Sequence, residues 1–196
     1  DINVSNYRFE PVSRSEIRYG LGAVKGTGEQ AVLSIEAERK AGGPFKDLFD
    51  FCRRVDKRVV NRRTIEALVC ALAFDAITDH RASLLASVGL AMESAEQHNR
   101  SLNQASLFGE DSAGDSAENL AEVPRWGEAE QLQYEKKSLG FYFSGHPYDS
   151  YRKELSTFIR TKLSDLAPQH QPVYMAGIIY AIRTQMTRRG KMAFIT

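Results

Sequence analysis

Apolar residues recur at helical spacing along most of the chain before residue 160. Ile65, Leu68, Val69 and Leu72 follow the i, i+3, i+4, i+7 spacing of one helix face, and Asn61 before them is a good N-cap residue. Similar stripes predict further helices over 29–39, 45–54, 79–99 and 127–138, and one that starts at Pro147. The pattern therefore predicts a mainly α-helical chain.

The same stripes predict which side chains are buried. We expect the core to contain Ala31, Val32, Ile35, Leu48, Phe49, Cys52, Leu84, Leu85, Val88, Met92 and Ala95. Asp79 is expected to cap the 79–99 helix, and Gly140 to end the 127–138 helix. The helix from Pro147 carries Tyr151, Leu155 and Phe158.

Three stretches lack helical periodicity. Residues 1–19 alternate apolar and polar side chains, which predicts extended chain. Residues 100–125 are rich in Ser, Asn, Gly, Asp and Glu, which predicts a mobile linker. Residues 173–183 and 192–196 favour strands, and two strands cannot close a barrel. We expect the truncated start of an oligonucleotide-binding (OB) fold there, with three cations near single-stranded nucleic acid: Arg188, Arg189 and Lys191.

Two glycines interrupt the helical pattern in the run Ala23-Val24-Lys25-Gly26-Thr27-Gly28. Glycine lets backbone N–H groups approach an anionic surface, and Gly28 opens a helix whose first N–H groups attract anions. The pattern apolar-Lys-Gly-x-Gly resembles the hairpin of a helix-hairpin-helix element, which holds DNA phosphates and reads no bases. A plain turn is the alternative. A dinucleotide loop of the form G-x-G-x-x-A is disfavoured by Glu29, which would face the pyrophosphate.

A second helix-turn-helix arrangement follows, so the unit occurs twice within residues 20–75. Six cations lie within 11 residues around this second hairpin: Arg53, Arg54, Lys57, Arg58, Arg62 and Arg63. A solvated basic face is the simple alternative. Because cations at a helix start oppose the helix dipole, an anionic partner explains them better. We predict non-specific binding to duplex DNA, with log affinity falling against log salt at a slope of about −4 to −5.

Composition limits the remaining possibilities. The 196 residues are 42% hydrophobic and 26% charged, and the formal net charge is +1, so a nucleic-acid signal must be local. No apolar run reaches membrane-spanning length, and no targeting segment is recognisable. Cys52 and Cys70 are expected as buried free thiols, which fits a cytoplasmic location. The chain lacks an initial Met and stops within a strand, so we expect a fragment.

The predicted linker contains one bulky apolar pair, Leu107 and Phe108. With Gln104 and Ser106, this pair resembles the bacterial sliding-clamp binding motif Q-x-x-[LM]-F. In such a peptide the glutamine fixes the register and the Leu-Phe pair fills an apolar pocket of the partner. The simple alternative is that both side chains fold back onto the body of the protein.

Candidate catalytic chemistry is weak. Ser144, His146 and Asp149 are close in sequence, whereas working triads gather residues from distant segments, so His146 is expected to cap or pack. The four histidines show no metal-ligand spacing. We predict no catalytic residue, metal site or cofactor in this chain.

Taken together, the motifs resemble one family, the alpha subunit of bacterial DNA polymerase III. The runs that carry the resemblance are residues 17–28, 43–52, 61–63, 73–75, 80–82, 104–109 and 139–147. The resemblance implies a fragment that follows the polymerase fingers, grips duplex DNA, binds the sliding clamp and works with other replisome subunits. The Mg²⁺-binding aspartates of the parent nucleotidyltransferase belong to the palm and lie outside this fragment. An error-prone paralogue is equally compatible with the sequence.

The resemblance also divides the chain. It implies a lead-in from the fingers (1–19), a tandem helix-hairpin-helix (20–82), a long helix and linker with the clamp motif at 104–108 (83–125), a helical connector (126–170) and the first OB strands (171–196). Leu72 stands where the family often has Gly. Since Leu72 completes an apolar stripe, we expect the helix to continue past it. The rival functions are a protein-interaction module and a DNA-repair enzyme domain.

Overall fold

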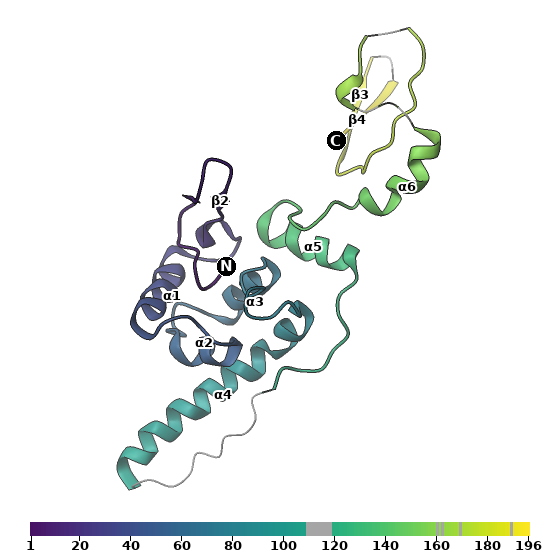
Figure 1. Ribbon diagram of the computed structural model, residues 1–196. Helices are drawn as coiled ribbons and strands as arrows, with labels where there is room; N and C mark the ends of the chain where they lie inside the picture. The colour runs from purple at the N-terminus through teal and green to yellow at the C-terminus, as the bar shows by residue number, and fades with distance from the viewer. Residues whose placement is uncertain (109–118, 160, 162, 169, 189) are drawn as a thin grey trace. The chain divides into compact units, whose positions relative to one another are not determined.

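The computed structural model describes residues 1–108, 119–159, 161, 163–168, 170–188 and 190–196. It forms two compact units, Asp1–Phe143 (unit 1) and Ser144–Thr196 (unit 2) (Figure 1). Unit 1 contains β1 (Glu10–Pro11), β2 (Ile17–Arg18), the 3-10 helix η1 (Leu21–Ala23), α1 (Glu29–Gly42), α2 (Leu48–Arg54), α3 (Arg62–Cys70), α4 (Arg81–Phe108) and α5 (Glu128–Leu139). Unit 2 contains α6 (Asp149–Phe158), the 3-10 helix η2 (Leu163–Asp165), β3 (Ile182–Thr187) and β4 (Gly190–Ile195). The prediction of a mainly helical chain with strands at its C-terminal end is confirmed.

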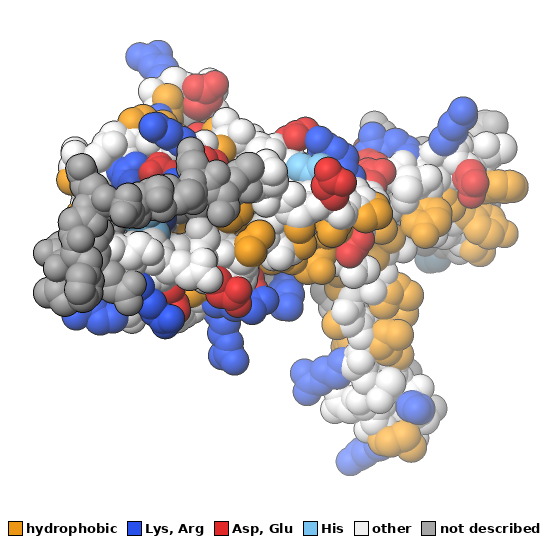
Figure 2. Space-filling view, turned by 90° about the horizontal axis from the view of Figure 1, so that it is seen from below, with side chains coloured by type: hydrophobic (Ala, Val, Ile, Leu, Met, Phe, Trp, Pro, Cys, Tyr) orange, Lys and Arg blue, Asp and Glu red, His pale blue; other side chains and the backbone are white. Residues whose placement is uncertain are grey.

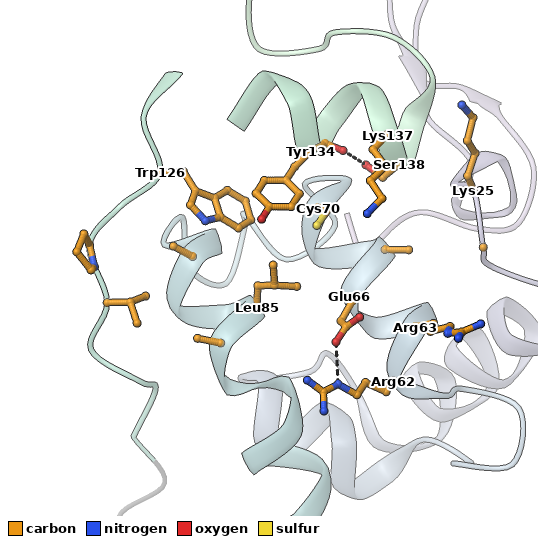
Figure 3. A pocket seen from close by; sticks show the side chains of 16 residues that line it. Lys25, Arg62, Arg63, Glu66, Cys70, Leu85, Trp126, Tyr134, Lys137 and Ser138 are labelled. Carbon is orange, nitrogen blue, oxygen red and sulfur yellow. Dashed lines mark hydrogen bonds and ion pairs between the residues drawn. The ribbon is translucent and has the colours of Figure 1, made fainter. Parts of the chain in front are cut away.

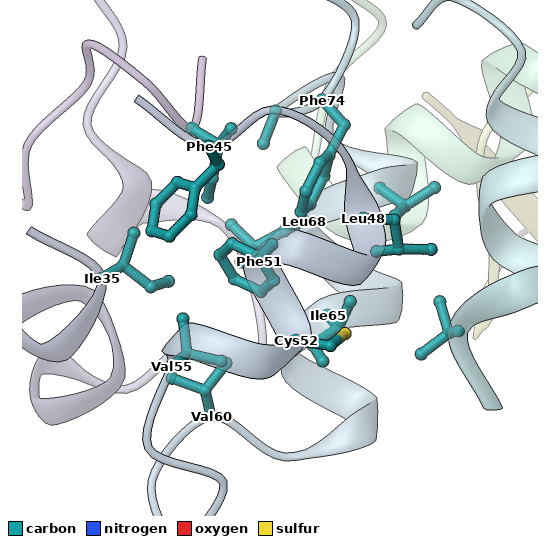
Figure 4. Close-up of a cluster of buried hydrophobic side chains, with 14 of the residues drawn as sticks. Ile35, Phe45, Leu48, Phe51, Cys52, Val55, Val60, Ile65, Leu68 and Phe74 are labelled. Carbon is teal, nitrogen blue, oxygen red and sulfur yellow. The ribbon is translucent and has the colours of Figure 1, made fainter. Parts of the chain in front are cut away.

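The core of unit 1 contains the predicted stripes, together with Phe45, Phe51 and Phe74, which those stripes did not include (Figure 4). Ile35, Leu48 and Leu68 are fully buried, and the stripe of α4 is buried or half-buried as expected. Phe51 lies at the centre, edge-to-face with Phe45 at 4.9 Å and with Phe74 at 5.1 Å between ring centroids. Such aromatic pairs add about 0.5–1.5 kcal/mol each beyond area burial.

The first residues of the chain are part of this core. Ile2 is fully buried, and its N–H donates to the carbonyl of Ala73 at 2.7 Å. Asn3 and the backbone of Phe45 exchange two hydrogen bonds, at 2.9 and 2.7 Å. β1 and β2 then form a short antiparallel hairpin where extended chain was expected. Residues 1–18 therefore contribute to unit 1 by packing as well as by connection.

Local side chains explain where the helices begin and end. Asn61 caps α3 as predicted, accepting from the N–H of Thr64 at 3.1 Å, and Gly140 ends α5 with φ +91°. The prediction for Asp79 is wrong. The N–H of Ser83 donates to Nδ1 of His80 at 3.2 Å, and Asp79 instead accepts from Arg125 at 2.9 and 3.1 Å.

Two predicted helix ends differ from the structure. α3 ends at Cys70, and Leu72 adopts φ +64°, so the helix does not continue past Leu72. The carbonyls of the last turn instead accept from Ala71 and Ala73, which closes the helix with the left-handed residue between them. α4 continues to Phe108, nine residues beyond the predicted end at residue 99. The clamp-like motif of Gln104, Ser106, Leu107 and Phe108 is helical in its backbone, and its side chains lie outside the described part of the structure.

A buried ion-pair network joins α4 to α5. Arg81, 8% exposed, donates to Asp75 at 2.6 to 3.0 Å and to the fully buried Glu135 at 2.9 Å. The second oxygen of Glu135 accepts from the N–H of Phe143 at 2.8 Å. Burial by itself lowers the pKa of Arg81, but its hydrogen bonds to both carboxylates raise that pKa overall, so the guanidinium stays charged. The network fixes α5 against the α3–α4 region.

Unit 2 is smaller, and its hydrophobic side chains are largely exposed. None of the residues of α6 is buried, and Phe158 and Tyr174 are 79% and 81% exposed. Figure 2 shows hydrophobic side chains reaching the surface of the molecule. β3 and β4 pair antiparallel from Ile182 opposite Ile195 to the turn at Thr187 and Gly190. The strand predicted over 173–183 begins only at Ile182, so that prediction is wrong for residues 173–181.

Candidate nucleic-acid interface

The first hairpin, residues 24–28, uses its two glycines differently. Gly26 has φ +92°, which an L-residue adopts only with strain. Gly28, the N-cap of α1, has φ −81°, and a Cβ built there would meet no atom within 4 Å. The fold therefore requires glycine at position 26 only. At position 28 the missing side chain leaves the start of α1 open to an outside group.

The other residues of this hairpin fix its position. The hydroxyl of Thr27 donates within the turn, 2.6 Å from the carbonyl oxygen of Val24, so it is used internally. The N–H of Lys25 donates to the carbonyl of Ser138 in α5 at 2.8 Å, while the Lys25 side chain is exposed. The hairpin is thus attached to α5 through its backbone and presents its ammonium group to solvent.

The second hairpin, residues 55–60, contains no glycine and is held by its own charges. Asp56 accepts from the backbone N–H of Arg58 at 3.0 Å and from its guanidinium at 3.1 Å. Hydrogen bonds from the Arg58 side chain and backbone lower the pKa of Asp56. Val55 and Val60 point into the core and anchor both ends of the turn.

Most of the six predicted cations make internal contacts. Arg54 donates to the carbonyls of Glu38 and Gly43 at 2.6 and 2.8 Å and lies over the ring of Phe45. Lys57 donates to the carbonyl of Met92 at 3.2 Å, and Arg53 is half-buried on α2. Arg62 pairs with Glu66 at 2.7 Å but is 64% exposed, and Arg63 is exposed.

The first hairpin and the start of α3 line one groove of about 880 Å³ (Figure 3). Lys25, Gly26, Arg62 and Arg63 line it together with Lys137 of α5, and we call it the cationic groove. The hydroxyl of Thr64 donates to the Gly26 carbonyl at 3.4 Å and joins the hairpin to α3. Among the described residues that line the groove, Glu66 is the one carboxylate. The structure therefore brings two of the six predicted cations beside the first hairpin.

Sequence reasoning missed the contribution of α5. Lys137 lies in the last turn of that helix, where a lysine is expected simply to complement the helix dipole. Trp126 and Tyr134 line the other end of the cationic groove, with ring centroids 4.2 Å apart and nearly parallel planes. Trp126 is the only tryptophan of the chain, which was the one signal available for it.

The thiol in the groove is not a nucleophile. Cys70 lines the groove from α3, and burial raises the pKa of its thiol to about 11, so it stays protonated at neutral pH. Burial raises the pKa of Cys52 to about 12. Both cysteines are buried and free, as predicted. In the described residues, His, Cys, Asp and Glu form no group of three that could hold a metal ion.

The remaining candidate residues lie elsewhere. His146 is exposed and makes contacts within unit 2: its Nδ1 accepts from the N–H of Tyr148 at 3.1 Å, and its Nε2 lies 2.8 Å from the hydroxyl of Tyr180. Arg188 and Lys191 are exposed at the β3–β4 turn of unit 2, and Arg189 falls outside the described residues. No helix in the described part of the chain has both the length and the apolarity to cross a membrane.

Comparison with known proteins shows which proteins this chain is similar to. Residues 1–84 match the helix-hairpin-helix motif. DNA polymerase III subunit alpha of Neisseria meningitidis serogroup B is 50% identical over 198 residues, which cover 100% of this chain. The subunits of Vibrio cholerae and Escherichia coli K12 are 41% and 36% identical, each over 97% of the chain. The chain spans 17% of the length of each of these relatives. It is therefore related, over essentially its whole length, to a segment of the DNA polymerase III alpha subunits, and it carries a helix-hairpin-helix motif.

Proposed function

We propose that unit 1 is a DNA-holding segment of a DNA polymerase III alpha subunit, which binds duplex DNA through its phosphates and without sequence preference. The observation that carries this proposal is that Lys25 and Gly26 of the first hairpin line one groove with Arg62 and Arg63 of α3. A hairpin used only for packing would not need exposed cations from two separate elements on the same surface.

The geometry suggests how phosphates are held. Gly28 leaves the first turn of α1 open, and a helix start offers unpaired N–H groups and a positive dipole end. Lys25, Arg62, Arg63 and Lys137 supply positive charges along the cationic groove, which Gly26 of the same hairpin also lines. None of these contacts depends on base identity, so affinity is electrostatic and sequence-independent.

Salt dependence tests the proposal. If Lys25, Arg62, Arg63 and Lys137 each neutralise one phosphate, log affinity for a blunt duplex falls against log salt with a slope of about −3 to −4. This is shallower than the sequence alone predicts, because Arg54 and Lys57 donate to backbone carbonyls. Fluorescence anisotropy of a labelled duplex measures the slope. A slope near zero would favour the protein-interaction module instead.

We also propose that residues 104–108 attach the chain to a ring-shaped sliding clamp. Among the side chains of α4 that the structure describes, which end at Ser101, Ala95 is the last buried one and residues 96–101 are all exposed, so this part of the helix extends beyond the core before the motif is reached. A tether of this kind keeps the polymerase near its template by raising the effective concentration. Leu107→Ala/Phe108→Ala should abolish binding to a purified clamp and leave duplex binding unchanged. Lys25→Glu/Arg62→Glu should do the reverse, and loss of both activities in either folded variant would contradict two separate sites.

A further inference from the structure

One end of the cationic groove has a chemistry that phosphate binding does not explain. Trp126 and Tyr134 stack there, both half-buried, and Leu85, Val123 and Pro124 extend the apolar wall. Duplex phosphates need cations and N–H donors, and gain nothing from an aromatic recess. A flat, uncharged group with a π face is what such a surface accepts.

We propose that the cationic groove binds a single unpaired nucleotide, with its base at the Trp126–Tyr134 end and its phosphate at the cations. The inference rests on the proposed function and adds a nucleotide site to it. The volume of about 880 Å³ lies in the range of small-molecule sites. Lys25, Arg63 and Lys137 give the phosphate end its positive charge, while Glu66 is paired with Arg62.

The two ends of the site belong to one framework. Arg125, next to Trp126, pairs with Asp79 at 2.9 Å, which holds the segment that carries the indole beside the start of α4. Glu135, next to Tyr134, is buried and paired with Arg81. On the following turn of α5, the Ser138 carbonyl accepts from the N–H of Lys25. The aromatic pair and the first hairpin are thus fixed to the same helix, α5.

The arrangement also limits what can bind. A cationic ligand would face four basic side chains and one paired carboxylate, and inorganic phosphate would leave the aromatic recess empty. A nucleotide matches both ends, because the base stacks on an aromatic ring and the phosphate meets the cations. The source of the nucleotide is either a DNA strand or a free deoxynucleotide, since both carry the same groups.

Trp126 reports directly on this site because it is the only tryptophan. Tryptophan fluorescence of the 196-residue chain is recorded with a blunt duplex, with the same duplex bearing a single-stranded overhang, and with deoxyadenosine monophosphate. We expect the overhang to quench the emission and the blunt duplex to leave it nearly unchanged. Quenching by the mononucleotide as well would identify free nucleotides as a second source. Equal response to both duplexes, or no response to any ligand, would overturn the inference.

A substitution adds an independent readout. Trp126→Leu should reduce affinity for the overhang duplex on the order of tenfold, to that of the blunt duplex, because stacking on one base is lost. Its affinity for the blunt duplex should stay the same, which also shows that the variant is folded. Phe141→Leu, which alters an exposed aromatic ring of unit 1 outside the groove, is the matched control. If wild-type protein binds the blunt duplex but prefers no overhang, the nucleotide site is wrong and the proposed function stands. If it binds no blunt duplex, the proposed function fails. Quenching of Trp126 by the mononucleotide then tests independently whether the groove binds a nucleotide.

Discussion

The two hairpins of unit 1 both connect helices, but they differ in glycine content, in charge and in the interactions that stabilise the turn. The first has two glycines and one lysine, and its turn is stabilised by a positive φ at Gly26 and by the hydroxyl of Thr27. The second has no glycine and is surrounded by cations, and it is stabilised by the pair of Asp56 and Arg58 and by the Asn61 cap. The first hairpin leaves open space at Gly28, before the first turn of α1, whereas the second satisfies much of its charge internally.

This difference shows that charge density in a sequence is a poor measure of charge available for binding. Arg54 and Arg63 are nine positions apart in the same basic run. The side chain of Arg54 is 18% exposed and donates to main-chain carbonyls, whereas Arg63 is exposed at the cationic groove. Arg54 therefore stabilises the fold, whereas Arg63 is accessible to a ligand in the groove.

The largest expected effect is on stability. Arg54→Ala should lower the free energy of unfolding by about 2–4 kcal/mol, because the partly buried carbonyls of Glu38 and Gly43 lose their donor. Urea unfolding followed by circular dichroism measures the change.

Arg63→Ala is the matched control for Arg54→Ala. It should change the free energy of unfolding by less than about 0.5 kcal/mol, as exposed substitutions usually do, and should weaken duplex binding. Equal stability losses in the two variants would remove the distinction between structural and available cations.

The second effect concerns DNA. Lys25→Glu/Arg63→Glu should weaken binding to a blunt duplex about 100-fold, since a charge-assisted phosphate contact is lost at each position. The salt slope should also become shallower by about 2. Arg58→Glu reverses a more exposed charge, 89% accessible, but one that is paired with Asp56 and does not line the groove. It should cost less than about threefold at physiological salt. A similar loss in both variants would mean that DNA senses the total charge and not the groove.

Much of the fold could be predicted because local patterns decide it. The apolar stripe of α3, the Asn61 cap and the glycine that ends α5 depend on residues within a few positions of one another. One error arose where a distant group competes. Asp79 was expected to cap α4, but it pairs with Arg125, which is 46 positions away in sequence. No periodicity argument contains that partner.

Contacts between residues distant in sequence also limit how much of the cationic groove could be predicted. The Gly-x-Gly motif and the basic run are visible in the sequence and predict a phosphate surface. Lys137 joins that surface, and Trp126 lies beyond it at the other end of the groove, only because the buried pair of Arg81 and Glu135 fixes α5 beside α3. Residues 54 positions apart make this pair, so the third side of the groove could not be deduced from spacing.

A third prediction separates fold from function within the first hairpin. Gly28→Ala should change stability by less than about 0.5 kcal/mol, because φ −81° suits alanine and no atom lies within 4 Å of the new Cβ. The added methyl group would stand where a phosphate approaches, so duplex affinity should fall, by on the order of tenfold if one charge-assisted hydrogen bond is lost.

Gly26→Ala, in contrast to Gly28→Ala, should lower the stability of the fold. At φ +92° alanine is strained, and the unfolding free energy should fall by about 1–2 kcal/mol. Unchanged duplex affinity in Gly28→Ala would show that DNA does not approach the start of α1, whatever the charges do.

The smallest expected effect lies at the helix ends, where the two hairpin units differ again. α1 is followed by Gly43 with φ +77°, whereas α3 is followed within two residues by Leu72 with φ +64°. Leu72→Gly should relieve about 1 kcal/mol of strain and lose a similar amount of burial, since the side chain is half-buried against the core. Leu72→Val keeps most of the apolar surface, but a β-branched residue tolerates positive φ poorly. Valine should therefore destabilise more than glycine.

Had α3 continued through Leu72, the order would be reversed, because glycine within a helix costs about 1 kcal/mol and valine costs less. The order of the two unfolding free energies thus distinguishes a left-handed helix end from an uninterrupted helix.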